Sequence, residues 1–249
     1  EEKYGLTEAL IAVPAYEQSS DQEVAFQAVD YILRVLKKNM VFGMTWGRAM
    51  HEFVEQLAKD ERLRSLSFQN VKVVPFLGTP GAIQSDSWNT TTYSNTLATK
   101  VGNLLHCASY NLSAPMYVEG TKEKELIESI DEIAKVLHMA ETADIALIGI
   151  GSMQDDSSII KAEIRTRELV RKGAVGEIVG RIYDKNGQTV DEDLKRKMVG
   201  ISLDKIAKIP VRVGMSYGKD KIEAIKGAIA GGLVNVLVTD VPTAELLLK

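Results

Sequence analysis

Short apolar runs alternate with longer amphipathic stretches from one end of the chain to the other. The short runs have the length and composition of β-strands and lie at residues 9–13, 39–44, 71–77, 143–150, 211–215 and 234–239. The longer stretches carry apolar residues at helical spacing and lie at residues 21–36, 50–57, 94–105, 123–138, 159–172, 219–230 and 242–248. Strands that alternate with helices are typical of a parallel sheet whose strands are joined by crossover helices. The pattern therefore predicts an α/β fold with a mostly parallel sheet flanked by helices. Because no repeat or linker divides the chain, we expect one domain over residues 1–249.

Three local features make this prediction more specific. Asp21 opens the first helical stretch and is expected to be its N-cap. The stretch 123–138 is expected to form one helix, whose core-facing residues would be Leu126, Ile130, Ile133 and Leu137. Alternating residues at 173–184 run into Asn186-Gly187, which is a strong signal for a β-hairpin.

Composition and charge narrow the possible functions. The 249 residues include 30 Lys and Arg against 34 Asp and Glu, which gives a net charge of −4 and argues against an autonomous nucleic-acid-binding domain. The one cysteine, Cys107, excludes an intramolecular disulfide and a Cys/His zinc cluster, so we expect no metal and a reducing, cytoplasmic location. Apolar runs such as 145–150 are far shorter than the ~20 residues that span a bilayer, so no membrane partner is expected.

Glycine-rich loops follow three of the predicted strands and provide candidate binding sites. When such a loop leads into a helix, free backbone N–H groups and the positive end of the helix dipole point at one place, where an anion binds. In a parallel sheet these loops meet at the edge where the carboxyl ends of the strands lie. A long irregular loop at 78–92 is also more often functional than idle. The loop residues expected at the site are Thr45, Trp46, Gly47, Arg48, Ala49, Gly78, Thr79, Gly149, Gly151 and Ser152.

Three charged residues stand out against this background. Arg48 and Lys221 both lie near the start of a predicted helix, where the dipole disfavours a cation, and Glu177 lies in a stretch that otherwise reads as buried. An anionic, hydroxyl-rich ligand would explain all three placements, since a carboxylate accepts from hydroxyls and cations meet a phosphate. The alternative for Lys221 is a solvated lysine cluster, and Trp46 suits a core position as well as a pocket wall. Glycines after strands often only make turns.

Three motifs give the sequence a family resemblance. Residues 41–49, Val-Phe-Gly-Met-Thr-Trp-Gly-Arg-Ala, resemble the Gly-x-Ser/Thr-Trp-Gly-Arg-Thr loop in the sugar-binding domain of SorC/DeoR-type bacterial transcriptional regulators. Residues 173–184 resemble that family's Gly-Ala-Val-Gly-Asp/Glu signature, and residues 221–240 are similar to its C-terminal signature. The motifs occur in the family's order over essentially the whole chain.

This resemblance implies a Rossmann-like fold related to phosphosugar isomerases and CoA transferases, used for sensing and not for catalysis. It implies a phosphorylated sugar held by the loop Thr45 to Ala49, with Glu177 on the sugar hydroxyls, Lys221 on the ligand, no cofactor and no catalytic residue. Ala49 departs from the hydroxyl residue common in the family and removes one donor. The resemblance also implies a dimer or tetramer, and operator DNA bound by an upstream helix-turn-helix domain that we expect to lie outside this chain. A phosphosugar isomerase-like enzyme with Glu177 as its base is the competing interpretation.

Overall fold

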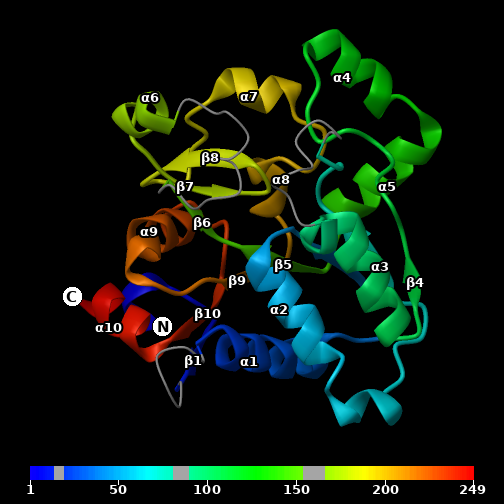
Figure 1. Ribbon diagram of the computed structural model, residues 1–249, viewed down its shortest axis with the longest axis vertical. Coiled ribbons are helices and arrows are strands. Elements are labelled where there is room, and N and C mark those ends of the chain that lie inside the picture. The colour runs from blue at the N-terminus through cyan, green and yellow to red at the C-terminus, as the bar shows by residue number, and fades with distance from the viewer. Residues whose placement is uncertain (14–19, 81–89, 154–165) are drawn as a thin grey trace.

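A parallel sheet of seven strands runs through the centre of the computed structural model, which describes residues 1–13, 20–80, 90–153 and 166–249 (Figure 1). The strand order is β1-β10-β9-β5-β2-β3-β4, and every pair of neighbours is parallel. The strands are β1 (Glu8–Ala12), β2 (Val41–Met44), β3 (Lys72–Pro75), β4 (Ala108–Ser109), β5 (Ile145–Gly149), β9 (Val211–Met215) and β10 (Val236–Asp240). The parallel α/β fold predicted from the sequence is confirmed.

Helices cover both faces of this sheet. One face packs against α1 (Ser20–Val35), α2 (Arg48–Leu57) and α3 (Ser94–Leu104). The other face packs against α5 (Asp131–Glu141), α8 (Leu203–Ile206), α9 (Ile222–Ala230) and α10 (Val241–Leu248). Residues of β5 alternate between the two cores, with Ile145 and Leu147 on the first and Ala146 and Ile148 on the second. This alternation follows from the two-residue period of a strand.

A second, smaller sheet lies above the second face and is antiparallel (Figure 1). It consists of β6 (Gly151–Ser152), β7 (Ala174–Ile178) and β8 (Arg181–Asp184). β7 turns into β8 through Val179 and Gly180, which have φ values of 56° and 71°. The predicted turn at Asn186-Gly187 is also present, because Tyr183 pairs with Thr189 beyond it. The tight β7–β8 turn inside residues 173–184 is the part that the sequence analysis missed.

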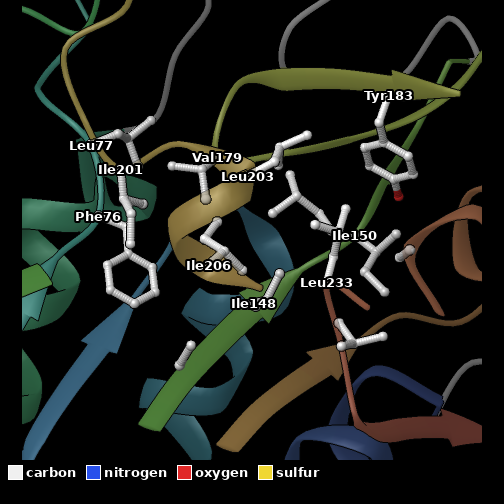
Figure 2. Close-up of a cluster of buried hydrophobic side chains, with 14 of the residues drawn as sticks. Phe76, Leu77, Ile148, Ile150, Val179, Tyr183, Ile201, Leu203, Ile206 and Leu233 are labelled. Carbon is white, nitrogen blue, oxygen red and sulfur yellow. The ribbon is translucent and has the colours of Figure 1, made fainter. Parts of the chain in front are cut away.

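Buried side chains of β5 and its extension fill the space between the two sheets (Figure 2). Ile148 and Ile150 share this cluster with Leu203 and Ile206 of α8 and with Val179 of the β7–β8 turn. The apolar contact fixes the small sheet over the carboxyl end of β5. It thereby determines where the side chains of β7 point.

Tyr183 provides a test of this layer. The residue is fully buried, and its hydroxyl donates a 2.9 Å hydrogen bond to the Ala224 carbonyl on α9. We expect Tyr183→Phe to lower the free energy of unfolding by about 1 kcal/mol, because one buried hydrogen bond is lost while the ring remains packed. Urea unfolding would measure the change, and Tyr117→Phe, at a tyrosine that is 47% exposed, is the control. Equal stabilities for the Tyr183 variant and the parent would contradict the expectation.

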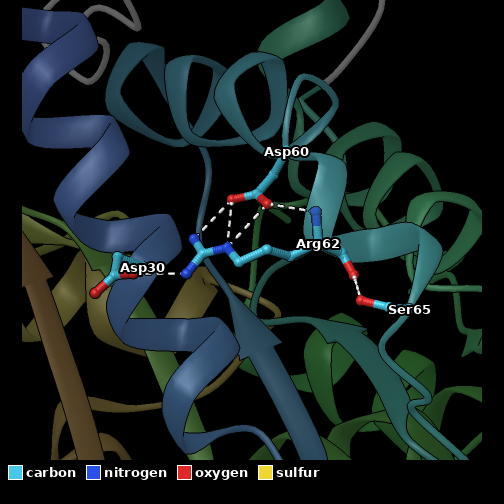
Figure 3. Close-up of polar contacts among 4 residues, drawn as sticks. All are labelled: Asp30, Asp60, Arg62 and Ser65. Atoms are coloured by element: carbon cyan, nitrogen blue, oxygen red, sulfur yellow. Dashed lines mark hydrogen bonds and ion pairs between the residues drawn. The ribbon is translucent and has the colours of Figure 1, made fainter.

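An arginine joins α1 to the chain that follows α2 (Figure 3). Arg62 lies in η3 (Glu61–Arg64) and makes a two-pronged contact with Asp60. Its Nε donates to the Asp60 Oδ1 at 2.9 Å, and its Nη2 donates to the Asp60 Oδ2 at 2.7 Å. Its Nη1 donates to the Asp30 Oδ1 of α1 at 2.7 Å. These hydrogen bonds to Arg62 lower the pKa of Asp60. The bridge ties α1 to the segment that follows α2, and both helices begin next to the cavity described below.

Three sequence-based expectations need correction or fall outside the described residues. Asp21 is not the N-cap, because α1 already begins at Ser20. The stretch 123–138 forms two helices, α4 (Thr121–Glu128) and α5. The break lies at Ser129, whose hydroxyl donates to the Leu126 carbonyl, and at Ile130, whose backbone is extended. Leu126 and Ile130 are 69% and 51% exposed, so the expectation that they face the core was wrong. Of the stretch 159–172, residues 166–172 are described, and they contain α6 (Thr166–Arg171). Residues 159–165, like residues 81–89 of the long loop, lie outside the described part.

Candidate functional site

The chain order reverses between β2 and β5, and a cavity opens at that point. From β2 the chain moves outward to β3 and β4, and it then returns to β5 on the other side of β2 before continuing to β9. Ligands of open α/β sheets bind at such a switch point, outside the carboxyl ends of the strands. The cavity has a volume of about 870 Å³, and its lining residues are Asp21, Trp46, Gly47, Arg48, Ala49, Gly149, Ile150, Gly151, Met153, Glu177, Met215, Ser216, Tyr217, Gly218, Asp220 and Lys221.

The amino terminus of α2 forms one wall of the cavity. Gly47 is the N-cap residue and has a φ of 107°, a conformation that favours glycine, and it has no side chain that could cap α2. Within the described part of the chain no side chain takes its place, so the first amides of the helix point outward at the positive end of its dipole. Arg48, the first helical residue, is exposed and forms no ion pair with any residue that the structure describes. This wall suits an anionic group.

Glu177 of β7 provides a buried acid on the opposite side. Its side chain hydrogen-bonds to Trp46, and the Oε2 atom has no hydrogen-bond partner among the described residues. Burial raises its pKa to about 7, although Lys221 and the Trp46 hydrogen bond act in the opposite direction. Gly151 pairs with Glu177 across β6 and β7, and a Cβ at Gly151 would lie 2.8 Å from the Glu177 Cγ. The glycine therefore provides the space that Glu177 occupies.

Lys221 is the second cation of the cavity, and its ammonium group is held by two neighbours. It lies at the end of η7 (Lys219–Lys221), directly before α9. Its Nζ donates to the Ser152 Oγ at 3.0 Å and lies 3.2 Å from the Asp220 Oδ2. Ser152 in turn donates to Asp220 at 2.9 Å. Burial acts to raise the pKa of Asp220, but Lys221 and Ser152 outweigh burial and lower it. Lys221 therefore enters the cavity already paired, whereas Arg48 has no ion-pair partner in the parts of the chain that the structure describes.

The loop after β9 forms a wall that the sequence analysis did not predict. The Tyr217 side chain lies close to Asp21 of α1, and burial together with Asp21 raises the pKa of Tyr217. The Ser216 hydroxyl donates to the Ile150 carbonyl at 3.2 Å, and Gly218 has a φ of 110°. The sequence did contain a signal for this loop, since Met215-Ser216-Tyr217-Gly218 ends a predicted strand in the same way as the three loops that were chosen. Asp21 was assigned only a capping role.

Most of the predicted site residues meet at the cavity, and four do not line it. Trp46 is both buried, at 5% exposure, and part of the wall, so its two interpretations coexist. Thr45 lies beneath the wall, where its hydroxyl accepts from the Gly149 N–H at 2.9 Å, and Ser152 supports Lys221. Gly78 and Thr79 lie elsewhere, because the end of β3 packs against residues 112–116: Thr79 pairs with Pro115, and a Cβ at Gly78 would lie 2.5 Å from the Ala114 carbonyl oxygen.

The described part of the chain shows neither a metal-binding cluster nor a membrane-spanning helix. The described residues contain no group of three or more His, Cys, Asp or Glu side chains that could hold a metal ion. In the same part of the chain, none of the helices combines the length and apolar character required to cross a bilayer.

Comparison with known proteins agrees with this geometry. A family model described as "Putative sugar-binding domain" matches residues 1–249. The sorbitol operon regulator of Klebsiella pneumoniae is 29% identical over 256 residues, which cover 100% of this chain and 78% of the regulator. The transcriptional regulator LsrR of Escherichia coli O9:H4 (strain HS) is 30% identical over 230 residues, which cover 89% of this chain and 67% of LsrR. The crystal structure of the full-length sorbitol operon regulator SorC superposes with a TM-score of 0.89 at 27% identity, covering 100% of this chain and 78% of that one.

Fold, cavity and similarity together define a sugar-binding domain of the kind found in bacterial transcriptional regulators. The chain belongs to the sugar-binding domain family of SorC/DeoR-type regulators. The resemblance inferred from the three sequence motifs is thereby confirmed.

Proposed function

We propose that the cavity binds a phosphorylated sugar and that the chain is the effector domain of a cytoplasmic transcriptional regulator of a sugar-catabolism operon. One observation carries the proposal. Arg48, Glu177 and Lys221, which are far apart in the sequence, line a single cavity at the switch point of the sheet.

The proposed ligand matches the distribution of charge around the cavity. The phosphate would lie at the amino terminus of α2, where the amides of Arg48 and Ala49 and the Arg48 guanidinium can donate to it. Ala49 brings no hydroxyl, so the backbone and Arg48 provide the contacts at this position. The sugar hydroxyls would face Glu177 and the paired Lys221 and Asp220. The two carboxylates would accept hydrogen bonds from these hydroxyls, and the Lys221 ammonium would donate to them.

Control of DNA binding requires that the ligand prefer one arrangement of the subunits. A ligand that bound all arrangements equally would change nothing, and coupling of this kind is usually worth about 1–3 kcal/mol. We propose that the domain assembles as a dimer or tetramer and that a helix-turn-helix domain outside this chain contacts the operator DNA.

The oligomeric state can be tested directly on this chain. We expect light scattering at micromolar concentration to give a mass of at least two subunits, because coupling between subunits needs an interface in this domain. A single-subunit mass over the whole concentration range would contradict the expectation.

Ligand binding is tested by a panel of sugar phosphates. Ribose, glucosamine and ketose phosphates would be added to the chain, each beside the same sugar without phosphate. The cognate compound is expected to raise the free energy of unfolding by about 2.7 kcal/mol at one hundred times its Kd, because it binds only the folded state. Thermal unfolding and calorimetry measure the effect. A panel in which phosphorylated and unphosphorylated sugars behave alike would count against the phosphate site.

An isomerase-like enzyme remains the second candidate because of one observation. A carboxylate with a pKa of about 7 is well suited to act as a general base near neutral pH, and Glu177 has this property. The regulators that resemble this chain favour sensing. Steady-state assays with the same sugar phosphates separate the two functions, since repeated turnover by the pure chain would establish the enzyme.

A further inference from the structure

Asp240 is a buried carboxylate that lies behind the cavity and does not line it. It is the last residue of β10 and is 5% exposed. Its Oδ1 accepts from the Thr243 N–H at 3.0 Å, and its Oδ2 accepts from the Ser20 hydroxyl at 3.0 Å. Among the described residues it forms no ion pair, so these hydrogen bonds compensate the burial of its charge. The first bond caps α10, but the second has no part in that cap.

Each of the two bonds leads to a different wall of the cavity. Thr243 is 1% exposed, and its hydroxyl accepts from the Gly218 N–H at 2.8 Å, which anchors the loop after β9. Ser20 begins α1 and directly precedes Asp21, which lines the cavity. The two walls also lie close to each other, because Asp21 is near enough to Tyr217 to raise the pKa of its hydroxyl. Asp240 is therefore the common support of two segments that are about two hundred residues apart in the sequence.

We propose that Asp240 is a positioning residue of the binding site, which sets the α1 wall against the wall formed by residues 216–218. Placement of polar groups around a ligand must be accurate to about half an ångström, and residues outside the contact shell commonly provide that accuracy. The consequence for ligand affinity rests on the function proposed above. The placement of the two walls relative to each other is independent of that function, and it can be measured without any ligand.

Hydrogen–deuterium exchange tests the positioning in the ligand-free chain. Ser20→Ala removes the bond to α1 and leaves the cap of α10 intact. We expect the amides of residues 216–218 to exchange about three to ten times faster in this variant, although the substitution is on another element, because one buried hydrogen bond no longer holds the walls together. Ser129→Ala, which removes a serine bond to the Leu126 carbonyl at the end of α4, is the matched control and should leave these amides unchanged. Exchange that changes in α1 alone would overturn the proposal.

Inorganic phosphate serves as the probe for the functional consequence, since it represents the charged part of any sugar phosphate. Thr243→Val removes the acceptor for Gly218, and Thr243→Ser keeps it. We expect Ser20→Ala and Thr243→Val to weaken phosphate binding several-fold and Thr243→Ser to restore it, while the melting temperatures of the two threonine variants stay close together. Equal binding by all variants would overturn the positioning role. If the parent chain itself binds no phosphate, the result counts against the proposed function, and the exchange measurement decides the positioning.

Discussion

Replacing Glu177 by glutamine is expected to raise the free energy of unfolding by about 3 kcal/mol at pH 8. The side chain is buried, its Oε2 has no partner among the described residues, and its pKa is raised from 4.5 to about 7. This difference in pKa corresponds to about 3 kcal/mol of destabilisation when the group is ionised. Glutamine has nearly the same shape and carries no charge, so it removes this cost.

The effect has a defined dependence on pH. The native state binds the proton of Glu177 more tightly than the unfolded chain does, so the stability of the parent falls as the pH rises from 4.5 to 7 and is then constant. The advantage of Glu177→Gln should therefore shrink to about 1 kcal/mol at pH 5 and disappear below pH 4.5. Denaturant unfolding at several pH values measures it. Glu61→Gln, at an exposed carboxylate, is the control that should show no such trend.

Trp46 offers an independent spectroscopic measurement, because it hydrogen-bonds to the Glu177 side chain. In a Trp88→Phe background, which leaves Trp46 as the one tryptophan of the chain, fluorescence should titrate with an apparent pKa of about 7. Glu177→Gln should abolish that titration. A signal that is flat between pH 5 and pH 9 in the parent would show that the carboxyl group does not ionise in this range.

Arg48→Ala is expected to weaken sugar-phosphate binding about 10- to 100-fold, which corresponds to the loss of one charge-assisted hydrogen bond of about 1.5–3 kcal/mol. The fold should not suffer, because Arg48 is exposed and has no ion pair within the described part of the chain. Removing a cation from the positive end of α2 should even raise the free energy of unfolding by about 0.3–1 kcal/mol. Affinity and stability are thus expected to change in opposite directions.

Calorimetry with a sugar phosphate, together with thermal unfolding of the same samples, measures both quantities. Arg64→Ala removes an arginine whose side chain is 82% exposed and which lies in η3, away from the cavity. It is the matched control, and its affinity should equal that of the parent. If Arg48→Ala bound as tightly as this control, Arg48 would not contact the phosphate.

Local sequence determined the elements that depend on neighbouring residues. Apolar periodicity located six of the seven strands of the main sheet, because residues on a buried strand must repeat with its period. It missed β4 (Ala108–Ser109), which is too short to show a period. Two kinds of local signal indicated a ligand. Glycines in loops 43–49 and 149–152 leave backbone amides free to bind an anion. Arg48, Glu177 and Lys221 carry charges at positions where a charge is destabilising unless a ligand or another group compensates it. The same reasoning was wrong for residues 123–138, where a serine hydroxyl bonded to a carbonyl ends the helix and apolar spacing alone does not reveal it.

Only the tertiary structure decided which strand ends share a cavity. Gly78-Thr79 has the same local pattern as the loops that line the site, yet β3 lies one strand farther from the switch point and its end packs against residues 112–116. Asp21, Tyr217 and Asp240 entered the site or its support through contacts between elements distant in the sequence. A strand-and-loop pattern is local, whereas strand order is set by long-range pairing and packing. Sequence therefore determined the chemistry available to this protein, and the order of its strands determined which of those groups meet.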